Sequence, residues 1–372
     1  MDRRTRKRYP FEPDYAVPPG KTLRETIDTL NMKQRELAVR TGLTPKTINL
    51  IAKGRAPITP DTAVLLERVT GVPARMWNNL ESNYREQLAK IEDRRRLEAD
   101  LDWLKCIPTR ELIDRGVIDE QPDKPALLQA VLRFFGVSSS QAWRNLWMHP
   151  AGAWRKSKCF RNKPGATATW LRLGELEALK IKTKPYHPEK FKGALHQIRR
   201  LTVERPSVFG PRMQELCAGA GAALVFVPQI KGCPASGVTR WLTPDKALLQ
   251  VSLRYGTNDH FWFTFFHEAG HILNDPKKEV FIETGHGDEP REEQANRFAA
   301  NHLVPQARAD ELPGLITRAN VIAFAKSIGI APGIVVGRLQ KEGIIGPSYL
   351  NELKQRFAWA SPTGRNGLKI TG

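Results

Sequence analysis

Two histidines and a glutamate lie together in one short segment, His267-Glu268-Ala269-Gly270-His271. Four residues is slightly more than one turn of an α-helix, so both imidazoles project from one face and can bind a single metal ion. Glu268 directly follows the first histidine, where it can reach a water on the metal without occupying a coordination position. Zinc lowers the pKa of such a water toward ~7, and a carboxylate can accept its proton while hydroxide attacks a peptide carbonyl. The segment predicts a hydrolytic zinc site, against the alternative of two helix histidines that never meet a metal.

A catalytic zinc takes a third protein ligand and leaves the fourth position to water. A second helix is expected to start near Asp288, with Pro290 in its first turn, and to continue through REEQANRFAANHLVP. Small residues on one stripe of this helix let it approach the first one closely, so Glu292 can reach the metal. Glu293 competes, but it points about 100° away on a helical wheel. His286 and His302 are further alternatives, although a loop or packing role suits each of them better.

The two helices need a scaffold, and the residues before them predict a small antiparallel sheet. Residues 221–230 are apolar and rich in β-branched side chains. Residues 237–241 and 247–253 are further short strands, separated by turn residues. The helix that carries the histidines can be capped by Thr257 or Asn258.

The first part of the chain has the spacing of a helix-turn-helix, with three helices expected between residues 20 and 55. Ala38 is small enough to let two helices cross closely, and Gly42 supplies a left-handed turn residue. Thr44 can cap the third helix, and Ile48 packs that helix onto the first. These positions predict a DNA-binding motif, in which the third helix would enter the major groove.

Polar side chains remain at the front of this motif once its apolar faces are buried. Asn49 can make a bidentate contact to adenine, and Lys53 and Arg55 can hold backbone phosphates. The alternative is a helical bundle used for dimerisation, whose charges are merely solvated. The turn at Gly42, the cap at Thr44 and the polar side chains at the front of the motif all favour DNA binding. We therefore expect DNA contacts from Gln34, Thr44, Lys46, Thr47, Asn49, Lys53 and Arg55.

The distribution of charge supports a polyanionic partner. The 372 residues carry a net charge of +19. Residues 1–90 hold 17 basic and 10 acidic side chains, and residues 144–200 hold 14 and 3. Residues 255–310, which contain the histidine pair, hold 5 and 10. The longest apolar stretches fall far short of a membrane span and the four cysteines are scattered, so a cytoplasmic protein without membrane contact is expected.

The middle and the tail of the chain carry weaker signals. A charged helix is expected over 84–104. From Trp154 to Lys184 the chain is basic with spaced aromatic residues, which could form a second nucleic-acid surface. More often, tryptophans at helical spacing belong to the core and the lysines face solvent. Residues 320–328 and 332–341 predict two short helices that flank Gly329, as in a degenerate helix-turn-helix used for packing. A last amphipathic helix is expected over 350–359.

Two resemblances to known families follow from these motifs. QRELA, INLIAKGRAPIT and MWNNLESNY resemble the HigA-type antitoxin repressors, which belong to the Xre-like helix-turn-helix class. FWFTFFHEAGHIL and EEQANRFAANHLVP resemble the ImmA/IrrE zinc metallopeptidases, bacterial and phage proteins that cleave Xre-type repressors. The second resemblance implies a zincin-like fold, Zn²⁺ as cofactor, His267, His271 and Glu292 as its ligands, and Glu268 as general base. The motif does not fix which residue stabilises the oxyanion.

The expected fold class is α+β and mainly helical, in five parts. These are a basic flexible arm (1–17), a helix-turn-helix bundle (18–90), a basic helical middle (91–193), a zincin-like peptidase domain with a small antiparallel sheet (194–360) and a flexible tail (361–372).

The first functional hypothesis is a DNA-binding zinc endopeptidase that cleaves a repressor or antitoxin protein and so relieves repression. The alternative is a non-proteolytic HigA-like antitoxin or repressor, whose peptidase-like domain senses a ligand or binds a partner. These hypotheses allow three further partners: operator DNA, a second copy of the chain and a toxin. An intact general base favours the endopeptidase, since a domain kept only for sensing needs none.

Overall fold

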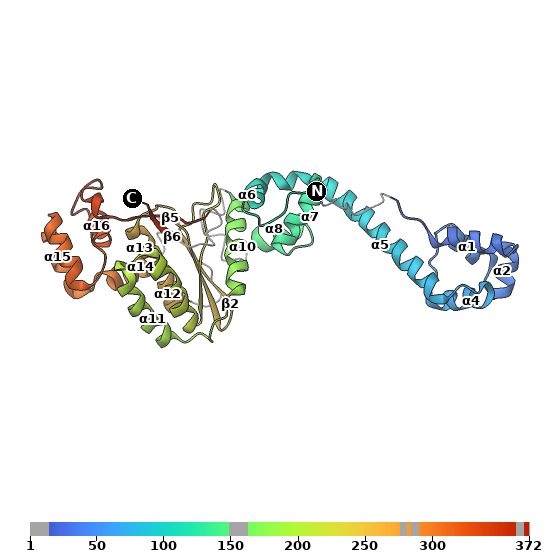
Figure 1. The fold of residues 1–372 in the computed structure, drawn as a ribbon, viewed down its shortest axis with the longest axis horizontal. Coiled ribbons are helices and arrows are strands. Elements are labelled where there is room, and N and C mark those ends of the chain that lie inside the picture. The colour runs from blue at the N-terminus through green and yellow to red at the C-terminus, as the bar shows by residue number, and fades with distance from the viewer. Residues whose placement is uncertain (1–14, 149–162, 276–280, 284–289, 362–367, 372) are drawn as a thin grey trace, which may run out of the picture. The chain divides into compact units, whose positions relative to one another are not determined.

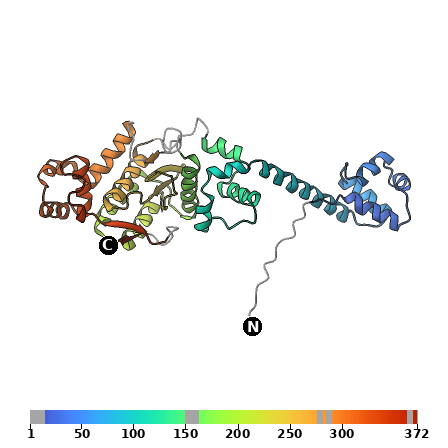
Figure 2. The same cartoon turned by 90° about the horizontal axis from the view of Figure 1, so that it is seen from above.

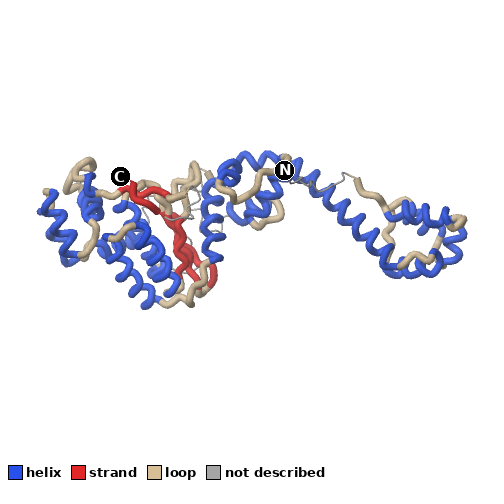
Figure 3. Tube along the Cα trace, viewed as in Figure 1, coloured by secondary structure: helices blue, strands red, loops and turns tan. Residues whose placement is uncertain are grey.

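The computed structural model describes residues 15–148, 163–275, 281–283, 290–361 and 368–371, and it divides the chain into two compact units, residues 1–101 and 102–372 (Figure 1). Helices predominate, and the strands of the described residues all belong to the second unit (Figure 3). The expected α+β, mainly helical fold class is thus confirmed. Most of the expected basic arm, and the basic residues 149–162, lie outside the described ranges.

The first unit is a bundle of helices around one apolar core. Leu23, Leu37, Ile48 and Trp77 are completely or almost completely buried in this core. Its helices are α1 (Pro19–Thr29), α2 (Gln34–Thr41), α3 (Pro45–Ala52), α4 (Pro60–Thr70) and α5 (Ala74–Ala99).

The turn between α2 and α3 has the geometry that the sequence predicts. Gly42 ends α2 in the left-handed region with a φ of 74°, which a side chain would strain. Thr44 precedes α3, and its hydroxyl accepts a hydrogen bond of 3.0 Å from the backbone N–H of Thr47. Ala38 and Ile48 are buried at the helix crossing. The helix-turn-helix is therefore present in the fold.

Helix α5 starts ten residues before the charged helix that the sequence suggests over 84–104. Pro73 sets its start, and neither glycine nor proline follows before Pro108, so nothing interrupts the helix at the expected boundary. Its first turns pack on the bundle through the buried Trp77 and Glu81. Further along, paired charges one turn apart support it, such as Glu86 with Lys90 and Arg94 with Glu98.

The second unit begins with short helices that surround an aromatic cluster. Trp103 and Trp143 meet edge to face at 5.4 Å between ring centroids, and Phe135 and Trp147 meet at 6.1 Å. Trp143 and Trp147 are thus core residues. Trp170, the described tryptophan of the basic stretch 154–184, is also fully buried, which fits the more conservative of the two interpretations of that stretch. The elements involved are the 3₁₀ turn Leu101–Cys106 and the helices α6 (Thr109–Asp114), α7 (Lys124–Phe135) and α8 (Ser140–Met148).

These helices attach directly to the rest of the second unit. Arg115, which follows α6, donates a hydrogen bond of 3.0 Å to the carbonyl of Pro228. Arg172 of α10 donates one of 2.9 Å to the carbonyl of Phe134, near the end of α7. The middle region therefore packs on the scaffold of the histidine-bearing domain.

The sheet of the second unit has the strand order β1-β3-β2-β4 and is mixed, so the purely antiparallel sheet expected from the sequence is wrong in one respect. Strands β2 and β3 form a hairpin, and β4 pairs antiparallel with β2. Strand β1 lies parallel to β3, with Ala222 opposite Ala247. The difference arises because the chain leaves β1, crosses to β2 and returns through the hairpin in the direction of β1. The bounds are β1 (Ala222–Phe226), β2 (Gly237–Thr243), β3 (Lys246–Val251) and β4 (Phe281–Glu283).

Helices cover both faces of this sheet (Figure 1 and Figure 2). Successive residues of β3 alternate between them: Leu249 joins the main apolar core, whereas the Gln250 side chain donates to the carbonyl of Trp170 in α10. Helix α13 packs on β2 and β3, α12 packs on β1, and α14 packs on α13. The helices are α10 (Pro164–Lys180), α11 (Pro188–Arg200), α12 (Pro206–Gly219), α13 (Asn258–Asn274) and α14 (Pro290–Leu303).

Two short helices follow, α15 (Arg318–Ile328) and α16 (Pro332–Lys341), with Gly329 in the left-handed region between them. Val335 and Leu339 of α16 are fully buried, so this helix packs as expected. Among the described helices, no single one has the length and apolar composition of a membrane span. Helices α15 and α16 have that length and composition only when they are taken together, and they are bent by 113° relative to each other.

The tail differs from the sequence expectation. Instead of an amphipathic helix over 350–359, the chain forms a 3₁₀ turn (Asn351–Leu353) and strand β5 (Arg356–Trp359). Instead of a flexible end from residue 361, residues 368–371 form β6 (Leu368–Thr371), which pairs antiparallel with β5. Phe357 and Leu368 are buried against the main core, and this long-range burial decides the conformation of both segments.

Candidate metal centre and nucleic-acid interface

Helix α13 places the two predicted histidine ligands together inside the second unit. His267 and His271 lie one turn apart, are almost completely buried, and have their Nε2 atoms 3.0 Å from each other. Thr257 occupies the N-cap position, yet its hydroxyl makes no capping hydrogen bond. Asn258 instead accepts hydrogen bonds from the backbone N–H groups of Asp259 and Gln355, which fixes the start of the helix.

Glu292 approaches the histidines from the first turn of α14. Its carboxylate oxygens lie 3.3 Å from Nε2 of His267 and 3.6 Å from Nε2 of His271. Ligand atoms placed tetrahedrally around zinc at 2.0–2.2 Å would lie about 3.3 Å apart. The three residues therefore form a group that fits a metal ion of this kind.

The competing ligands take no part in this group. Glu293 is 72% exposed and faces Arg297. His302 is half-buried and packs its ring against Phe266 and Phe298, so it is a packing histidine. His286 lies outside the described residues.

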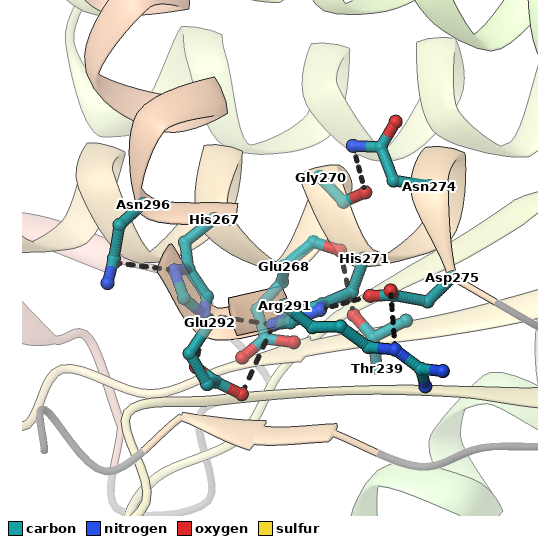
Figure 4. Close-up of polar contacts among 10 residues, drawn as sticks. All are labelled: Thr239, His267, Glu268, Gly270, His271, Asn274, Asp275, Arg291, Glu292 and Asn296. Atoms are coloured by element: carbon teal, nitrogen blue, oxygen red, sulfur yellow. Dashed lines mark hydrogen bonds and ion pairs between the residues drawn. The ribbon is translucent and has the colours of Figure 1, made fainter. Parts of the chain in front are cut away.

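The outer nitrogen of each histidine has its own hydrogen-bond partner (Figure 4). Nδ1 of His267 lies 3.0 Å from Oδ1 of Asn296, and Nδ1 of His271 lies 2.5 Å from Oδ2 of Asp275. Arg291 lies 3.9 Å from the same Asp275 carboxylate. Such partners fix the orientation of a ligating imidazole and direct Nε2 toward the metal.

The electrostatics of the group favour a cation. Burial alone would raise the pKa of Glu292, but hydrogen bonds with His267 and His271 outweigh it and lower the pKa to about 2. Burial would likewise lower the pKa of His271, but hydrogen bonds with Asp275 and Glu292 outweigh it and raise the pKa to about 9. Positive charge is thus stabilised at this position, and the carboxylate is ionised across the neutral range.

Glu268 is fully buried beside the ligands, on the face of α13 that meets strand β2. Thr239 of β2 donates a hydrogen bond of 3.0 Å to the Glu268 backbone carbonyl. Gly237 lies against the Glu268 side chain, and a β-carbon there would come within 2.6 Å of its carboxylate oxygen Oε1. The glycine therefore provides the space that this carboxylate occupies.

Three residues of the centre were not predicted from the sequence: Asp275, Asn296 and Gly237. Asp275 and Asn296 each follow a ligand by four residues, so the helical repeat that identified His271 could have found them too. Gly237 carries no such signal, because its role depends on how β2 packs on α13.

The residues predicted to contact DNA lie at the surface of the first unit. Gln34 and Thr47 are half-buried, and the others are exposed. The Thr44 hydroxyl is already engaged in capping, 2.8 Å from the Thr47 hydroxyl, so these two side chains hold each other in place. The exposed members of the set are Thr44, Lys46, Asn49, Lys53 and Arg55.

Comparisons with known proteins agree with this division of the chain. Residues 21–77 match the helix-turn-helix family, and residues 254–321 match the IrrE N-terminal-like domain, a peptidase family. A stretch of 74 residues is 35% identical to the uncharacterized HTH-type transcriptional regulator YddM of Escherichia coli (strain K12). This similarity covers 20% of the present chain and 77% of the relative.

Proposed function

We propose that this chain, which belongs to the helix-turn-helix transcriptional regulators and also carries an IrrE N-terminal-like domain, is a DNA-binding zinc endopeptidase that cleaves a repressor-like protein. One observation carries the proposal: three ligand atoms converge within 4.8 Å of one another beside the buried carboxylate of Glu268. A domain that only binds a partner needs no such carboxylate.

The residues of the centre divide the chemistry among them. His267, His271 and Glu292 would hold the zinc, which supplies a Lewis acid and lowers the pKa of water when bound. Glu268 is the base: it would accept the proton from the attacking water and pass it to the leaving amine. Its carboxylate occupies the space that Gly237 on β2 leaves open, beside the ligands.

The first unit would deliver this activity to an operator. We infer binding of an inverted repeat by a homodimer, with α3 in the major groove and half-sites about one helical turn apart. The exposed side chains of Lys46, Asn49, Lys53 and Arg55 support this inference. Such a protein would act in the cytoplasm, and its substrate would be a repressor or antitoxin.

The non-proteolytic alternative rests on the similarity to a relative that is named as a transcriptional regulator. In this reading the chain is an antitoxin or repressor, a toxin is an additional partner, and the metal centre only stabilises the fold or senses a ligand. The two hypotheses differ in whether the Glu268 carboxylate is needed: cleavage requires it as a base, whereas a partner-binding or sensing domain does not.

The decisive experiment compares Glu268→Gln with the wild type in cells, reading new protein N-termini by mass spectrometry and DNA binding by gel shift. The endopeptidase reading expects new N-termini with the wild type and with Glu293→Gln, whose exposed side chain makes it a matched control. It expects none with Glu268→Gln, although this variant still binds DNA and zinc. Identical N-termini for the wild type and Glu268→Gln would overturn the endopeptidase and favour the alternative.

A further inference from the structure

The start of the helix-turn-helix unit is fixed against the end of helix α3. A β-carbon on Gly20 would overlap the backbone carbonyl oxygen of Ile51, so helices α1 and α3 meet backbone to backbone. A β-carbon on Gly54 would come within 2.7 Å of Cβ of Pro18 and within 3.2 Å of the Tyr84 hydroxyl. Both glycines therefore leave room for close contacts, and these contacts hold the chain at Pro18.

The chain enters this unit between the two cations that are expected to hold DNA phosphates. Lys53 and Arg55 flank Gly54, the residue against which Pro18 packs, and both of their side chains are exposed. Lys21, in the first turn of α1, is exposed as well. The residues before Pro18 therefore start at the edge of the proposed DNA interface.

These preceding residues carry the densest positive charge of the first unit. Residues 3–8 hold five basic side chains and no acidic one: Arg3, Arg4, Arg6, Lys7 and Arg8. Residues 9–17 hold no basic side chain, but they include Glu12 and Asp14. An acidic spacer that phosphates would repel thus separates the cations from Pro18.

The spacer is long enough to carry the cations past one phosphate strand into the neighbouring minor groove. From Arg8 to Pro18 the chain can extend about 33 Å, at roughly 3.3 Å per residue. The minor groove beside the major groove that α3 would occupy lies half a helical turn away, about 17 Å along the duplex. A narrow minor groove rich in A·T pairs has an enhanced negative potential, which attracts arginine.

We propose that residues 3–8 form a second DNA contact, inserted in the minor groove beside the major groove that α3 reads, with a preference for A·T base pairs. The assignment rests on the operator binding proposed for the first unit, which it deepens by adding a groove and a base preference. Four of the five cations are arginines. This composition favours the groove over a contact with phosphates alone, because a guanidinium is more weakly hydrated than an ammonium and enters a narrow groove at a smaller cost.

The test uses the full chain and an operator that the wild type selects from random DNA. One variant replaces three arginines of the segment with alanine: Arg3→Ala, Arg4→Ala and Arg6→Ala. A second variant replaces the same three with lysine and so keeps their charge. The matched control removes three exposed arginines near the end of α5: Arg94→Ala, Arg95→Ala and Arg96→Ala.

Three versions of the operator distinguish the two grooves. The base pairs about five positions from the centre of each half-site, half a helical turn away, are A·T, G·C or inosine·cytosine. Inosine lacks the 2-amino group of guanine, so its pair with cytosine has the minor groove of A·T and the major groove of G·C. In gel-shift titrations the wild type should bind the A·T and inosine versions alike, and the G·C version roughly fivefold to tenfold more weakly.

The variants should separate base preference from charge. The alanine variant should bind all three versions equally, with a shallower salt dependence than the control, which should keep the preference. The lysine variant should keep the salt dependence and lose most of the preference. Binding of the inosine version at the level of the G·C version, or an A·T preference that the alanine variant retains, would overturn the minor-groove contact. A loss of affinity without any change in base preference would reduce it to a phosphate contact and overturn it too.

Asn49→Ala distinguishes this contact from base reading by α3. It should relax the preference within the half-sites and leave the A·T preference beside them. If the wild type selects half-sites without a flanking preference, operator binding stands and the minor-groove contact fails. If it selects A·T-rich DNA without any half-site, and the alanine variant loses this selection, α3 fails as the reader while the minor-groove contact stands. A chain that binds no DNA would contradict both.

Discussion

At the scale of single residues, the hydrogen bond between His271 and Asp275 should matter for metal affinity. Asp275→Asn removes the charge that orients the imidazole, so zinc affinity should fall 10- to 100-fold in a competition titration with a chelator. Asn274→Ala is the matched control, since the Asn274 side chain donates to the helix carbonyl of Gly270 and, among the described residues, has no hydrogen bond with a ligand. Equal zinc affinities for Asp275→Asn and the wild type would show that Asp275 does not support the ligand.

His302 should make the second unit sensitive to acid. Burial, aided by the nearby charges of His196 and Arg199, lowers its pKa from 6.5 to about 4. The unfolded chain therefore binds the proton first as the pH falls, and the free energy of unfolding decreases between pH 6.5 and about 4. Above this window the histidine contributes no pH dependence.

The measurement is the melting temperature of the wild type and of His302→Phe as a function of pH. The variant, whose ring can stack on Phe266 and Phe298, should lose less stability across that window. Parallel profiles for the two proteins would contradict the assignment.

What the sequence reveals at this scale depends on local periodicity. His267 and His271 could be placed because helix geometry relates residues that are close in sequence. Glu292, 21 positions after His271 on α14, is predicted instead from the small residues of its own helix and from the resemblance to the peptidase family. The contact between Gly237 and Glu268 joins residues 31 positions apart in different elements, and no repeat encodes it.

At the scale of elements, strand β2 positions the carboxylate of Glu268, and Gly237→Ala tests this. The added methyl would overlap Glu268 and Thr264, so turnover of any cleaved substrate should fall while zinc binding remains. Overpacking of this kind typically costs 1–3 kcal/mol of stability. Gly210→Ala is the control, because among the described residues its added β-carbon would meet just the ring of Phe226, at an ordinary contact distance of 3.9 Å. Unchanged turnover in Gly237→Ala would show that strand β2 does not position the Glu268 carboxylate for cleavage.

Helix α3 should read bases, whereas the residues after it hold the DNA backbone. Asn49→Ala should cost roughly 1–3 kcal/mol on the operator and relax base preference. Lys53→Ala should weaken binding to all sequences and reduce the salt dependence. Both side chains are exposed, so neither change disturbs the core. Gel-shift titrations in which the wild type binds operator and scrambled DNA equally would contradict this assignment.

The elements themselves were predictable where the pattern was local and strong. The caps and glycine turns of the first unit, and helices α13 and α14, follow from the sequence. The tail could not be read in the same way: Phe357 and Leu368 form strands because the main core buries them, and this core is assembled from distant residues. The parallel pairing of β1 with β3 is likewise a property of the whole sheet.

At the scale of the whole molecule, basic charge outside the helix-turn-helix should strengthen DNA binding without adding specificity. Residues 144–200 carry 14 basic and 3 acidic side chains. A shortened chain that ends at Leu101, where the first unit ends, should bind its operator more weakly and with a shallower dependence on salt. If DNA affinity depends on salt concentration equally in the shortened and the full chain, this charge does not contribute to DNA binding.

The strand order has a consequence for how the second unit is synthesised. Ala222 of β1 pairs with Ala247, so β1 is synthesised, and emerges from the ribosome, 25 residues ahead of its partner strand. The hairpin of β2 and β3 can form locally, but β1 must wait for it with its apolar AALVF sequence unpaired. During this interval the nascent chain exposes a strand that can associate with other chains. Yield of folded protein should therefore be limited by aggregation during translation more than by the stability of the finished fold.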